Sequence, residues 1–465
     1  MSNTQRNTAV IGFGKSGKGT LDFLLDKRKG ENLFLYNDTP IDNPAEQKHY
    51  EELGVTFLLG EALFRKLEEM NEIIVSPGVD ARADRFKGIR EKNVKIIAEI
   101  ELGYSFIQSP IIGVTGTNGK STTVSLIHHL LKHSGANSYL AGNIGLPFIS
   151  EVDHIASQKN AVVVLELSSF QLEEIIHFKP HVGLILNITP DHLDRYKSME
   201  DYFSAKLNIV MNQSSEDYLV LNADDTYLKE TAEKNPSRFG PAKQIWFSNK
   251  GKSKGVHLWI ESNAVHFDNN GVEEIISLAE NPLRGSHNLE NIMAAVAAVR
   301  MMGVSVSDIE KSLPHFKGLS HRMESVGKIG NVEFINDSKA TNVDAALKSI
   351  SSLPAPMIVI LGGKDKGSDF RLLSPSISTG VEKVLLVGKA AGIIRSQLEM
   401  DGLKDKLIDI TDLNDAVEKG IQLLGEKGGI VLLAPGCASF DMFKNFEHRG
   451  DVFREAVANY KEKKV

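Results

Sequence analysis

The chain has 465 residues, of which 42% are hydrophobic and 24% charged, with a net charge of −7 at pH 7. This composition is typical of a soluble globular protein with about two to four domains, and the negative charge argues against a nucleic-acid surface. The only cysteine, Cys437, excludes an intrachain disulfide framework and a cysteine metal cluster. No stretch resembles a signal peptide or a membrane span of ~20 apolar residues, so we expect a cytoplasmic protein that binds no membrane.

A glycine-rich turn follows the first predicted strand. The strand covers 8–11, the turn is Gly12-Phe13-Gly14-Lys15-Ser16-Gly17, and a helix is predicted to begin at Gly19. A second strand, 33–38, ends in Asp38 about 20 residues after the turn. This pattern is the fingerprint of dinucleotide binding, in which the acid bonds a ribose hydroxyl. The same geometry accepts any nucleotide linked through a pyrophosphate, so the residues alone leave the ligand open.

A second glycine-rich loop is the strongest motif. Ile111-Ile112-Gly113-Val114 is a predicted buried strand, Thr115-Gly116-Thr117-Asn118-Gly119-Lys120-Ser121 follows it, and a helix is predicted over 122–131. This order is that of a P-loop, in which backbone N–H groups bind phosphate oxygens, the lysine reaches the outer phosphates and the serine hydroxyl binds Mg²⁺. Val114 stands where the general pattern has glycine, so the loop is a variant. The alternative is a tight turn without a ligand.

Three further polar residues belong to the same region. Glu166 ends an apolar strand over 161–166. His192 follows a strand over 182–187, and Lys206 lies on the next predicted helix. Because ligands bind at the carboxyl ends of strands in open α/β sheets, these side chains can converge on a phosphate-bound magnesium ion. The alternatives are a solvated acid, a histidine with a local hydrogen bond and a surface lysine.

The last third of the chain repeats the α/β pattern. Four strands are predicted there, and polar or glycine-rich sequence follows most of them: 332–335, 357–361, 384–387 and 430–433. We therefore expect an α/β protein with three domains. These are a Rossmann-like domain over 1–107, a central P-loop ATPase domain with a mostly parallel sheet over 108–318, and a Rossmann-like domain over 319–465.

The motifs resemble those of the ATP-dependent ligases of peptidoglycan precursor synthesis, the Mur ligase family. The resemblance rests on Gly116-Thr117-Asn118-Gly119-Lys120-Ser121, on Glu166-Leu167-Ser168-Ser169-Phe170-Gln171-Leu172-Glu173 and on Asp191-His192-Leu193-Asp194-Arg195-Tyr196. In the last third, the stretches 336–342, 362–370 and 439–451 are similar to the branch of the family that adds D-glutamate. The resemblance spans the whole chain, and the family shares the valine of the P-loop.

The resemblance implies an ATP-dependent ligase that joins UDP-N-acetylmuramoyl-L-alanine to D-glutamate through an acyl phosphate, releasing ADP and phosphate. The implied cofactors are ATP, Mg²⁺ at two sites and a carbamate that CO₂ forms on Lys206. The implied partners are these small molecules, with no nucleic acid and no membrane, and we expect a monomer.

The resemblance also implies four groups of site residues. The catalytic and metal-binding residues would be Lys120, Ser121, Glu166, His192 and Lys206, the last as a carbamate. ATP would contact Thr115, Gly116, Thr117, Asn118, Gly119, Lys120, Ser121, Thr122, Asn288, Asn291, Arg322, Asp337 and Lys339. The UDP substrate would contact Ser16, Asp38, Thr39, Gly78 and Asn143. D-glutamate would contact Thr341, Lys366, Ser439 and Phe446.

Other functions stay open. A sister ligase, or a folate-polyglutamylating ligase, that adds another amino acid would share the central domain, although the stretches 337–342 and 444–450 argue against both. An NAD-dependent dehydrogenase would use only the first glycine-rich turn and leave two domains idle. A non-catalytic nucleotide-gated binding protein would have no use for the combination of Lys120, Glu166, His192 and Lys206.

Overall fold

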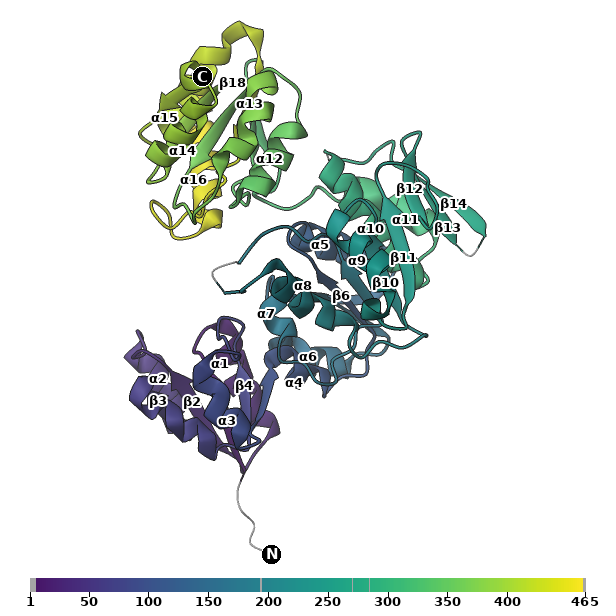
Figure 1. Ribbon diagram of the computed structural model, residues 1–465, viewed down its shortest axis with the longest axis vertical. Coiled ribbons are helices and arrows are strands. Elements are labelled where there is room, and N and C mark those ends of the chain that lie inside the picture. The colour runs from purple at the N-terminus through teal and green to yellow at the C-terminus, as the bar shows by residue number, and fades with distance from the viewer. Residues whose placement is uncertain (1–5, 193–194, 270, 284, 463–465) are drawn as a thin grey trace, which may run out of the picture. The chain divides into compact units, whose positions relative to one another are not determined.

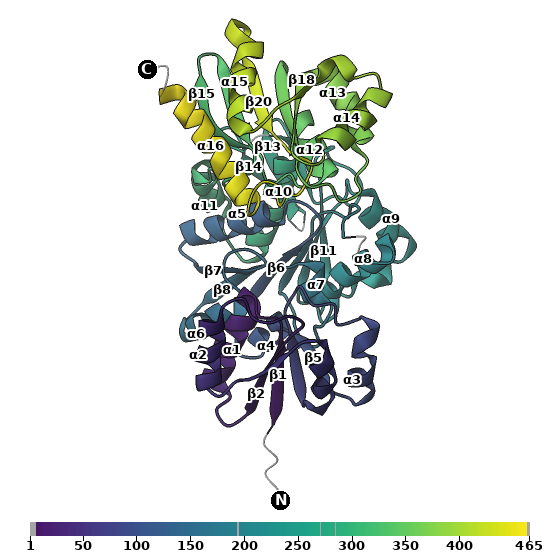
Figure 2. The same ribbon diagram turned by 90° about the vertical axis from the view of Figure 1, so that its left-hand side faces the viewer.

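The computed structural model describes residues 6–192, 195–269, 271–283 and 285–462. Within these residues the strands form three sheets of 5, 9 and 6 strands, which can be followed in Figure 1 and Figure 2. Contacts divide the chain into two compact units, Met1–Asn281 with Glu290–Pro314, and Pro282–Leu289 with His315–Val465. The first unit holds the first two sheets and the second unit holds the third.

The first sheet is parallel and has the strand order β3-β2-β1-β4-β5. Its central strands are largely buried because helices cover both faces of such sheets. The strands are β1 (Asn7–Ile11), β2 (Asn32–Asn37), β3 (Thr56–Leu59), β4 (Glu72–Val75) and β5 (Lys95–Ala98). The helices are α1 (Lys15–Lys27), α2 (Pro44–Glu52), α3 (Lys87–Glu91) and α4 (Glu99–Tyr104).

The second sheet has the order β14-β13-β12-β11-β10-β9-β6-β8-β7 and is parallel apart from the pairs β12–β13 and β13–β14. Its central strands β6, β8 and β9 are buried at every position. The strands are β6 (Ile111–Thr115), β7 (Asn137–Gly142), β8 (Ala161–Glu166), β9 (Val182–Ile185), β10 (Tyr218–Asn222), β11 (Lys243–Ser248), β12 (Leu258–Glu261), β13 (Ala264–Asn269) and β14 (Val272–Ser277). The helices are α5 (Lys120–His133), α6 (Phe148–Ser157), α7 (Ser169–Leu172), α8 (Met199–Leu207), α9 (Thr226–Lys234), α10 (Ser286–Met301) and α11 (Val306–Ser312).

The third sheet has the order β15-β16-β20-β17-β18-β19, and only β15 runs antiparallel to its neighbour. The strands are β15 (Glu324–Ile329), β16 (Val332–Asn336), β17 (Met357–Gly362), β18 (Val381–Val387), β19 (Leu407–Asp409) and β20 (Gly429–Leu433). The helices are α12 (Val343–Ser351), α13 (Ser374–Gly380), α14 (Ala391–Met400), α15 (Leu413–Leu424) and α16 (Phe446–Glu462). The expected α/β fold with a mostly parallel central sheet is confirmed.

The structure also differs from the expected elements. α1 begins at Lys15 rather than Gly19, so Gly17 lies inside the helix. A Cβ atom on Gly17 would lie 1.9 Å from the carbonyl oxygen of Gly12, and only glycine allows this close approach of helix to strand. The sequence favours more sheet over about 217–271, which covers β10 to β13, whereas strands β3, β5, β7, β14, β15 and β19 were not expected. They are short or only partly buried, and so lack the apolar runs on which the prediction relied.

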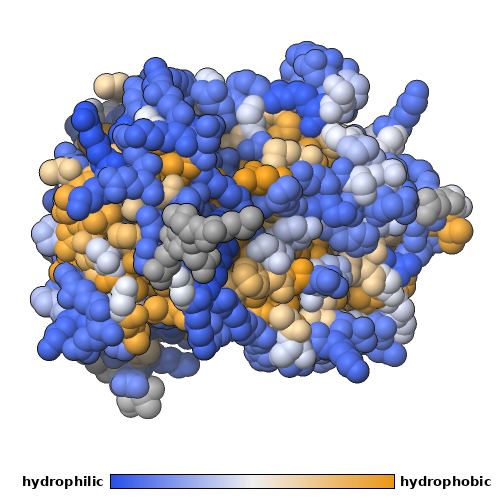
Figure 3. All heavy atoms as spheres, turned by 90° about the horizontal axis from the view of Figure 1, so that it is seen from below, coloured by the Kyte–Doolittle hydropathy of each residue, from blue (hydrophilic) through white to orange (hydrophobic). Residues whose placement is uncertain are grey.

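One face of the molecule is shown in Figure 3, where blue hydrophilic and orange apolar residues alternate in small patches. Exposed large apolar side chains include Val272, Leu372, Met400 and Phe440. Apolar atoms contribute over half of the accessible surface of most folded proteins, so such residues need no special role. Among the helices in the described part of the chain, none is both long and apolar enough to cross a membrane.

Two buried carboxylates lie in α4, where the chain passes from the first sheet to the second. Glu101 accepts hydrogen bonds from the backbone N–H groups of Ile176, His177 and Phe178, at 2.9, 2.9 and 2.8 Å. Glu99 accepts one such bond, from Ile149 of α6 at 2.5 Å. With three donors the Glu101 carboxylate is well stabilised, whereas burial raises the pKa of Glu99 to about 7.

Glu99 predicts a pH-dependent stability. In the folded chain its pKa exceeds the value of 4.5 expected on unfolding, so the folded state binds more protons between these two values and loses stability as the pH rises through them. Glu99→Gln keeps an acceptor for Ile149 and removes the charge. The variant should melt a few degrees above the parent at about pH 8 and close to the parent at about pH 5, as measured by calorimetry. An equal difference at both pH values would contradict the burial argument.

Candidate active site

The second glycine-rich loop joins β6 to α5. Gly116 and Gly119 have φ angles of 140° and 88°, in the left-handed region that favours glycine. The Nζ of Lys120 donates to the carbonyl oxygens of Gly116 and Thr117, both at 2.8 Å. Thr115, Ser121 and Thr122 are buried beside the loop. The predicted P-loop therefore has strand, glycine conformations, lysine and helix in the expected order.

Asn187, which follows β9, holds this loop in place. Its carbonyl oxygen accepts the Thr117 N–H at 2.9 Å and its Oδ1 accepts the Asn118 N–H at 2.8 Å. Its Nδ2 donates to the Asn118 carbonyl oxygen at 3.1 Å. Sequence reasoning missed Asn187, although its position at the carboxyl end of the strand next to β6 was an available signal.

α10 carries the two predicted asparagines. Asn291 is buried, its Oδ1 accepts a hydrogen bond from Thr123 Oγ1 at 3.2 Å, and a Cβ on Gly119 would lie 2.4 Å from that oxygen. The structure thus places Asn291 directly against the P-loop. Asn288 is also buried and lies in the first turn of α10, where its N–H donates to the Gly285 carbonyl oxygen at 3.0 Å.

Lys206 of α8 is 2% exposed, and its side chain packs against the P-loop. Its Nζ donates to the Gly116 carbonyl oxygen at 2.8 Å, so Lys120 and Lys206 share this acceptor. Burial, followed by the neighbouring Lys120, lowers the pKa of Lys206 well below its ordinary value. The Tyr202 ring lies 4.5 Å from Nζ. This lysine is not the exposed surface residue that was the alternative.

Glu166 ends β8 and is 3% exposed. Its Oε1 accepts a hydrogen bond from Asn143 Nδ2 at 2.8 Å, while its Oε2 is buried without a hydrogen-bond partner among the described residues. A buried carboxylate oxygen without a donor is costly unless a ligand or ion completes it. Glu166 is therefore not a solvated acid.

The surroundings of Glu166 fit Mg²⁺. Within the described residues, no group of three or more His, Cys, Asp or Glu side chains could hold a metal ion. Mg²⁺ does not need such a group, because it commonly takes one or two carboxylates and completes its shell with phosphate oxygens and water. The Glu166 oxygen without a hydrogen-bond partner and the Ser121 hydroxyl at the start of α5 are oxygen atoms that can bind Mg²⁺.

His192 lies after β9 and has a positive φ angle. Its φ is 54°, and its carbonyl oxygen accepts the N–H groups of Arg195 and Tyr196, both at 3.0 Å. The imidazole is exposed, lies 3.8 Å from Asp191 Oδ2, and packs against the Phe170 ring at a centroid distance of 4.9 Å. A non-glycine residue with positive φ is uncommon and persists where neighbouring contacts hold it.

The predicted UDP residues in the first sheet lie at strand ends and at the start of α1. Ser16 Oγ is buried without a hydrogen-bond partner among the described residues. Gly78 lies in the turn after β4, where the Val79 N–H donates to the Ser76 carbonyl oxygen at 3.0 Å. Asp38 and Thr39 follow β2, and the Thr39 side chain and carbonyl oxygen both accept from Asn37.

Asp38 has a partner that sequence reasoning missed. Arg85 Nη1 donates to Asp38 Oδ1 at 2.8 Å, and Tyr36 donates to the same oxygen at 2.7 Å. The arginine holds the pKa of Asp38 below its ordinary value. The pair is 47 residues apart in the chain, so no local motif marked it.

In the second unit, the loops after β16, β17 and β20 lie side by side. The Gly436 N–H donates to the Ala340 carbonyl oxygen at 2.9 Å, and backbone hydrogen bonds join Lys364 to Ala438 in both directions. This arrangement brings the predicted D-glutamate residues Thr341 and Ser439 to one end of the sheet. Lys366 is exposed on the loop after β17, and Phe446 starts α16.

Buried Arg449 joins these loops and was missed by sequence reasoning. It donates to Ser338 Oγ, the Ser338 carbonyl oxygen and the Cys437 carbonyl oxygen at 2.9, 2.8 and 3.1 Å. Ser338 Oγ in turn donates to the Phe446 carbonyl oxygen at 2.8 Å. Arg449 therefore fixes three segments of the candidate amino-acid site.

The remaining predicted ATP residues of this unit lie near the same sheet end. Asp337 is buried, and its carboxylate accepts hydrogen bonds from the Met323 N–H and the Ser349 hydroxyl. Burial raises the pKa of Asp337, against the opposing effects of the Ser349 hydrogen bond and of Arg322. Lys339 Nζ lies 3.7 Å from the centre of the Phe446 ring.

Comparison with protein-family models gives three matches that follow one another along the chain. They are the MurD-like N-terminal domain of Mur ligases over 6–98, the Mur ligase middle domain over 114–299, and the Mur ligase glutamate ligase domain over 321–437.

Curated relatives are similar over nearly the whole chain. A UDP-N-acetylmuramoylalanine–D-glutamate ligase of Pelotomaculum thermopropionicum is 37% identical over 463 residues, which cover 98% of both chains. A ligase of the same name from Thermoanaerobacter sp. is 39% identical and covers 97% of this chain and 98% of the relative.

Solved structures share the fold. The MurF ligase of Thermotoga maritima in complex with ADP gives a TM-score of 0.58 at 17% identity and covers 100% of this chain and 97% of that chain. A pseudomurein peptide ligase type C from Methanothermus fervidus gives 0.59 at 18% identity and covers 98% and 100%.

Proposed function

The chain belongs to the Mur ligase family, and we propose that it joins the free carboxylate of UDP-N-acetylmuramoyl-L-alanine to the amine of D-glutamate, with ATP becoming ADP and phosphate. One observation carries this proposal: Lys120 of the P-loop and the buried Lys206 both donate to the Gly116 carbonyl oxygen, so both amines lie at the place where phosphates would bind. Relatives named as D-glutamate ligases support the choice of amino acid, and the rival ligases of other amino acids are not favoured.

The chemistry explains why a nucleoside triphosphate is needed. A carboxylate is a poor acyl donor because its leaving group would be oxide. Attack of a carboxylate oxygen on the γ-phosphorus of ATP breaks the bond to the β,γ-bridging oxygen, which releases ADP and gives an acyl phosphate. The D-glutamate amine then attacks the acyl carbon, loses a proton and expels phosphate. The protein mainly positions the groups and neutralises their charge. When ATP binds, the Lys120 ammonium group would exchange its hydrogen bonds to the Gly116 and Thr117 carbonyl oxygens for contacts with the transferring phosphoryl group.

The same residues would hold the metal ions. We assign Ser121 and Glu166 to one Mg²⁺, and His192 with a carbamate on Lys206 to a second. Bound Mg²⁺ would supply charge neutralisation at the phosphate oxygens. Burial and the lowered pKa of Lys206 favour the neutral amine, which is the form that adds to CO₂. The carbamate would place two carboxylate-like oxygen atoms at the end of the Lys206 side chain, and Mg²⁺ prefers oxygen ligands.

The first sheet would bind the UDP substrate. The start of α1 lacks a side-chain cap, and the buried hydroxyl of Ser16 lacks a partner among the described residues, so a pyrophosphate oxygen would satisfy both. Asp38, Thr39 and Gly78 lie on neighbouring loops, and Asn143 would bring the sugar-peptide portion toward Glu166. We propose domains over 1–107, 108–318 and 319–465.

One chain supplies the P-loop, Glu166 and Lys206, so we propose that it acts as a monomer. ATP is a cytoplasmic metabolite, and we propose that compartment. ATP itself would lie on residues 115–122, with Asn288 and Asn291 toward the adenine and Arg322, Asp337 and Lys339 as contacts from the C-terminal domain.

D-glutamate brings two carboxylates, so its site needs a cation. We assign this role to Lys366, with the Thr341 and Ser439 hydroxyls and the backbone at Phe446 as further donors. A hydrogen bond to a charged group contributes about 1.5–3 kcal/mol. Lys366→Ala should therefore raise the KM for D-glutamate about tenfold to a hundredfold while the KM for ATP stays within about twofold.

Lys404 gives a matched control for this prediction. It is an exposed lysine of the same unit that precedes β19, at the opposite end of the strands. Lys404→Ala should leave both KM values unchanged. An unaltered KM for D-glutamate in Lys366→Ala would remove Lys366 from the amino-acid site.

The proposed function is tested by phosphate release from ATP in the presence of the UDP-sugar-alanine acceptor and one amino acid at a time. D-glutamate should support turnover, whereas L-glutamate, L-lysine and diaminopimelate should not. Turnover with L-lysine equal to that with D-glutamate would instead indicate a sister ligase.

A further inference from the structure

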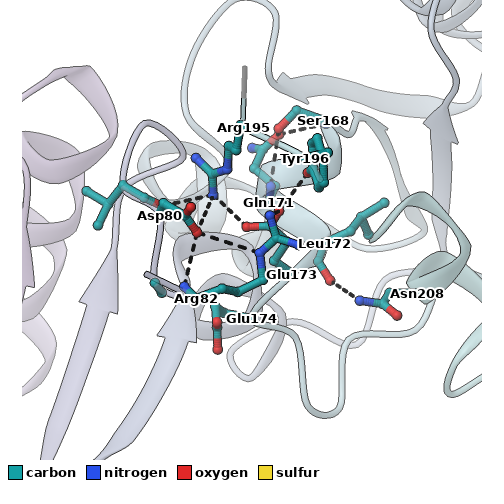
Figure 4. Close-up of polar contacts among 12 residues, drawn as sticks. Asp80, Arg82, Ser168, Gln171, Leu172, Glu173, Glu174, Arg195, Tyr196 and Asn208 are labelled. Carbon is teal, nitrogen blue, oxygen red and sulfur yellow. Dashed lines mark hydrogen bonds and ion pairs between the residues drawn. The ribbon is translucent and has the colours of Figure 1, made fainter. Parts of the chain in front are cut away.

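A second polar cluster lies next to the candidate active site, where the loop after β4 meets α7 and the segment after His192. Figure 4 shows Arg195 and Arg82 directed toward Asp80 and Glu173. Arg195 Nη2 donates to Glu173 Oε2 at 2.5 Å and to the Val79 carbonyl oxygen at 3.1 Å. It lies 3.8 Å from Asp80 Oδ1. The cluster therefore joins the loop that carries Gly78 to the central sheet.

Glu173 is the centre of this cluster. Its side chain is 3% exposed, and besides Arg195 it accepts a hydrogen bond from the Tyr196 hydroxyl at 2.6 Å and pairs with Arg82 at 3.2 Å. A carboxylate buried to this degree needs such partners, because an unpaired buried charge is strongly destabilising. The cluster is thus a built arrangement rather than a surface ion pair of negligible energy.

The cluster is connected to His192 in two ways. The Arg195 and Tyr196 N–H groups both donate to the His192 carbonyl oxygen. The Arg195 guanidinium lies 4.0 Å from the centre of the Phe170 ring, and the same ring packs against the His192 imidazole. The backbone and the ring of His192 are therefore both held by groups that Arg195 contacts.

We propose that Arg195, anchored by Glu173, is a positioning residue that fixes His192 and links it to the UDP-side loop after β4. The positive φ of His192 is unfavourable for a residue other than glycine, so it persists only where surrounding contacts hold it. The side-chain partners of Arg195 are protein groups, so we assign it no direct part in the chemistry. Its contribution is to hold the imidazole where the substrate carboxylate and the transferring phosphoryl group meet, a role that rests on the proposed function.

Arg90 provides a matched control. It donates to the Ala81 carbonyl oxygen at 3.2 Å and to Glu174 Oε1 at 2.6 Å. Like Arg195, it therefore bonds one backbone carbonyl of the loop after β4 and one carboxylate, and its carboxylate is next to Glu173 in the chain. Among the described residues, Arg90 makes no hydrogen bond or ion pair with Arg195 or Tyr196. A purely structural role at this junction would affect both arginines, whereas a positioning role would affect Arg195 alone.

The test uses Arg195→Met, which keeps an unbranched apolar side chain but removes the guanidinium, together with Arg90→Met. A misplacement of about 1 Å can cost about a hundredfold in rate, so Arg195→Met should lower kcat about tenfold to a hundredfold. The KM for ATP should stay within about twofold, and Arg90→Met should keep kcat within about twofold. Hydrogen exchange of the backbone amides at positions 195 and 196 should be faster than in the parent in Arg195→Met, and unchanged in Arg90→Met.

Two further variants keep the result decisive. Glu173→Gln, a nearly isosteric change, should reproduce the loss of kcat, and Arg195→Lys should restore part of it. Equal kcat values for Arg195→Met and the parent, or unchanged amide exchange, would overturn the inference. His192→Ala then separates the causes: if it is inactive, only the role of Arg195 is wrong, and if it is active, the proposed role of His192 is wrong as well.

Discussion

Replacing Lys120 by alanine is expected to lower kcat for phosphate release by about a hundredfold to a thousandfold or more. Lys120 is the cation at the turn of the P-loop, with its Nζ on the carbonyl oxygens of Gly116 and Thr117. Removing a preorganised group that stabilises transition-state charge has an effect of this size. Steady-state phosphate release with acceptor and D-glutamate at saturation measures it.

Lys132 serves as the control for this change, because it is an exposed lysine in the last turn of the same helix, α5. Lys132→Ala should retain parental kcat, and both variants should melt close to the parent. Turnover of Lys120→Ala within tenfold of the parent would show that the loop is a structural turn.

The second large effect is expected for Lys206→Ala, which should lose at least about a hundredfold in kcat. The substitution removes the nitrogen on which the proposed carbamate would form, and with it the oxygen donor that we assign to a second magnesium ion. It also leaves a cavity beside Tyr202 and removes a donor from the Gly116 carbonyl oxygen, so the thermal stability must be measured alongside.

A direct observation separates the carbamate from these structural effects. With ¹³C-labelled bicarbonate, the parent should show a protein carbamate resonance by ¹³C NMR, and Lys206→Ala should lack it. Lys229→Ala, which changes an exposed lysine of α9, should keep both the signal and the activity. A fully active parent without any carbamate signal would contradict this role of Lys206.

Most of the site framework could be predicted from the sequence. The P-loop and the ends of β8 and β9 are marked by local patterns, namely apolar runs that stop at glycine or at polar residues. The structure places Lys120 and Glu166 at these positions, and Lys206 of α8 lies close to both. The predicted fold class follows from the same alternation of strands and helices, and the comparisons confirm it.

The partners of the site residues could not be predicted in this way. Arg195 and Glu173 are 22 residues apart, and Arg449 lies 111 residues from Ser338. A charged residue carries no sequence signal for which distant group it will meet. Asn187 is intermediate, because its place at a strand end was visible but its three hydrogen bonds to the P-loop were not.

The central claim is that ATP activates the acceptor carboxylate for attack by D-glutamate, and isotope transfer tests it most directly. The acceptor is prepared with ¹⁸O in both oxygens of its alanyl carboxylate and incubated with ATP, Mg²⁺, D-glutamate and the parent enzyme. The account predicts that the released phosphate carries one ¹⁸O and that the other remains in the new amide. Phosphate without ¹⁸O, or phosphate release that proceeds equally well without D-glutamate, would contradict it.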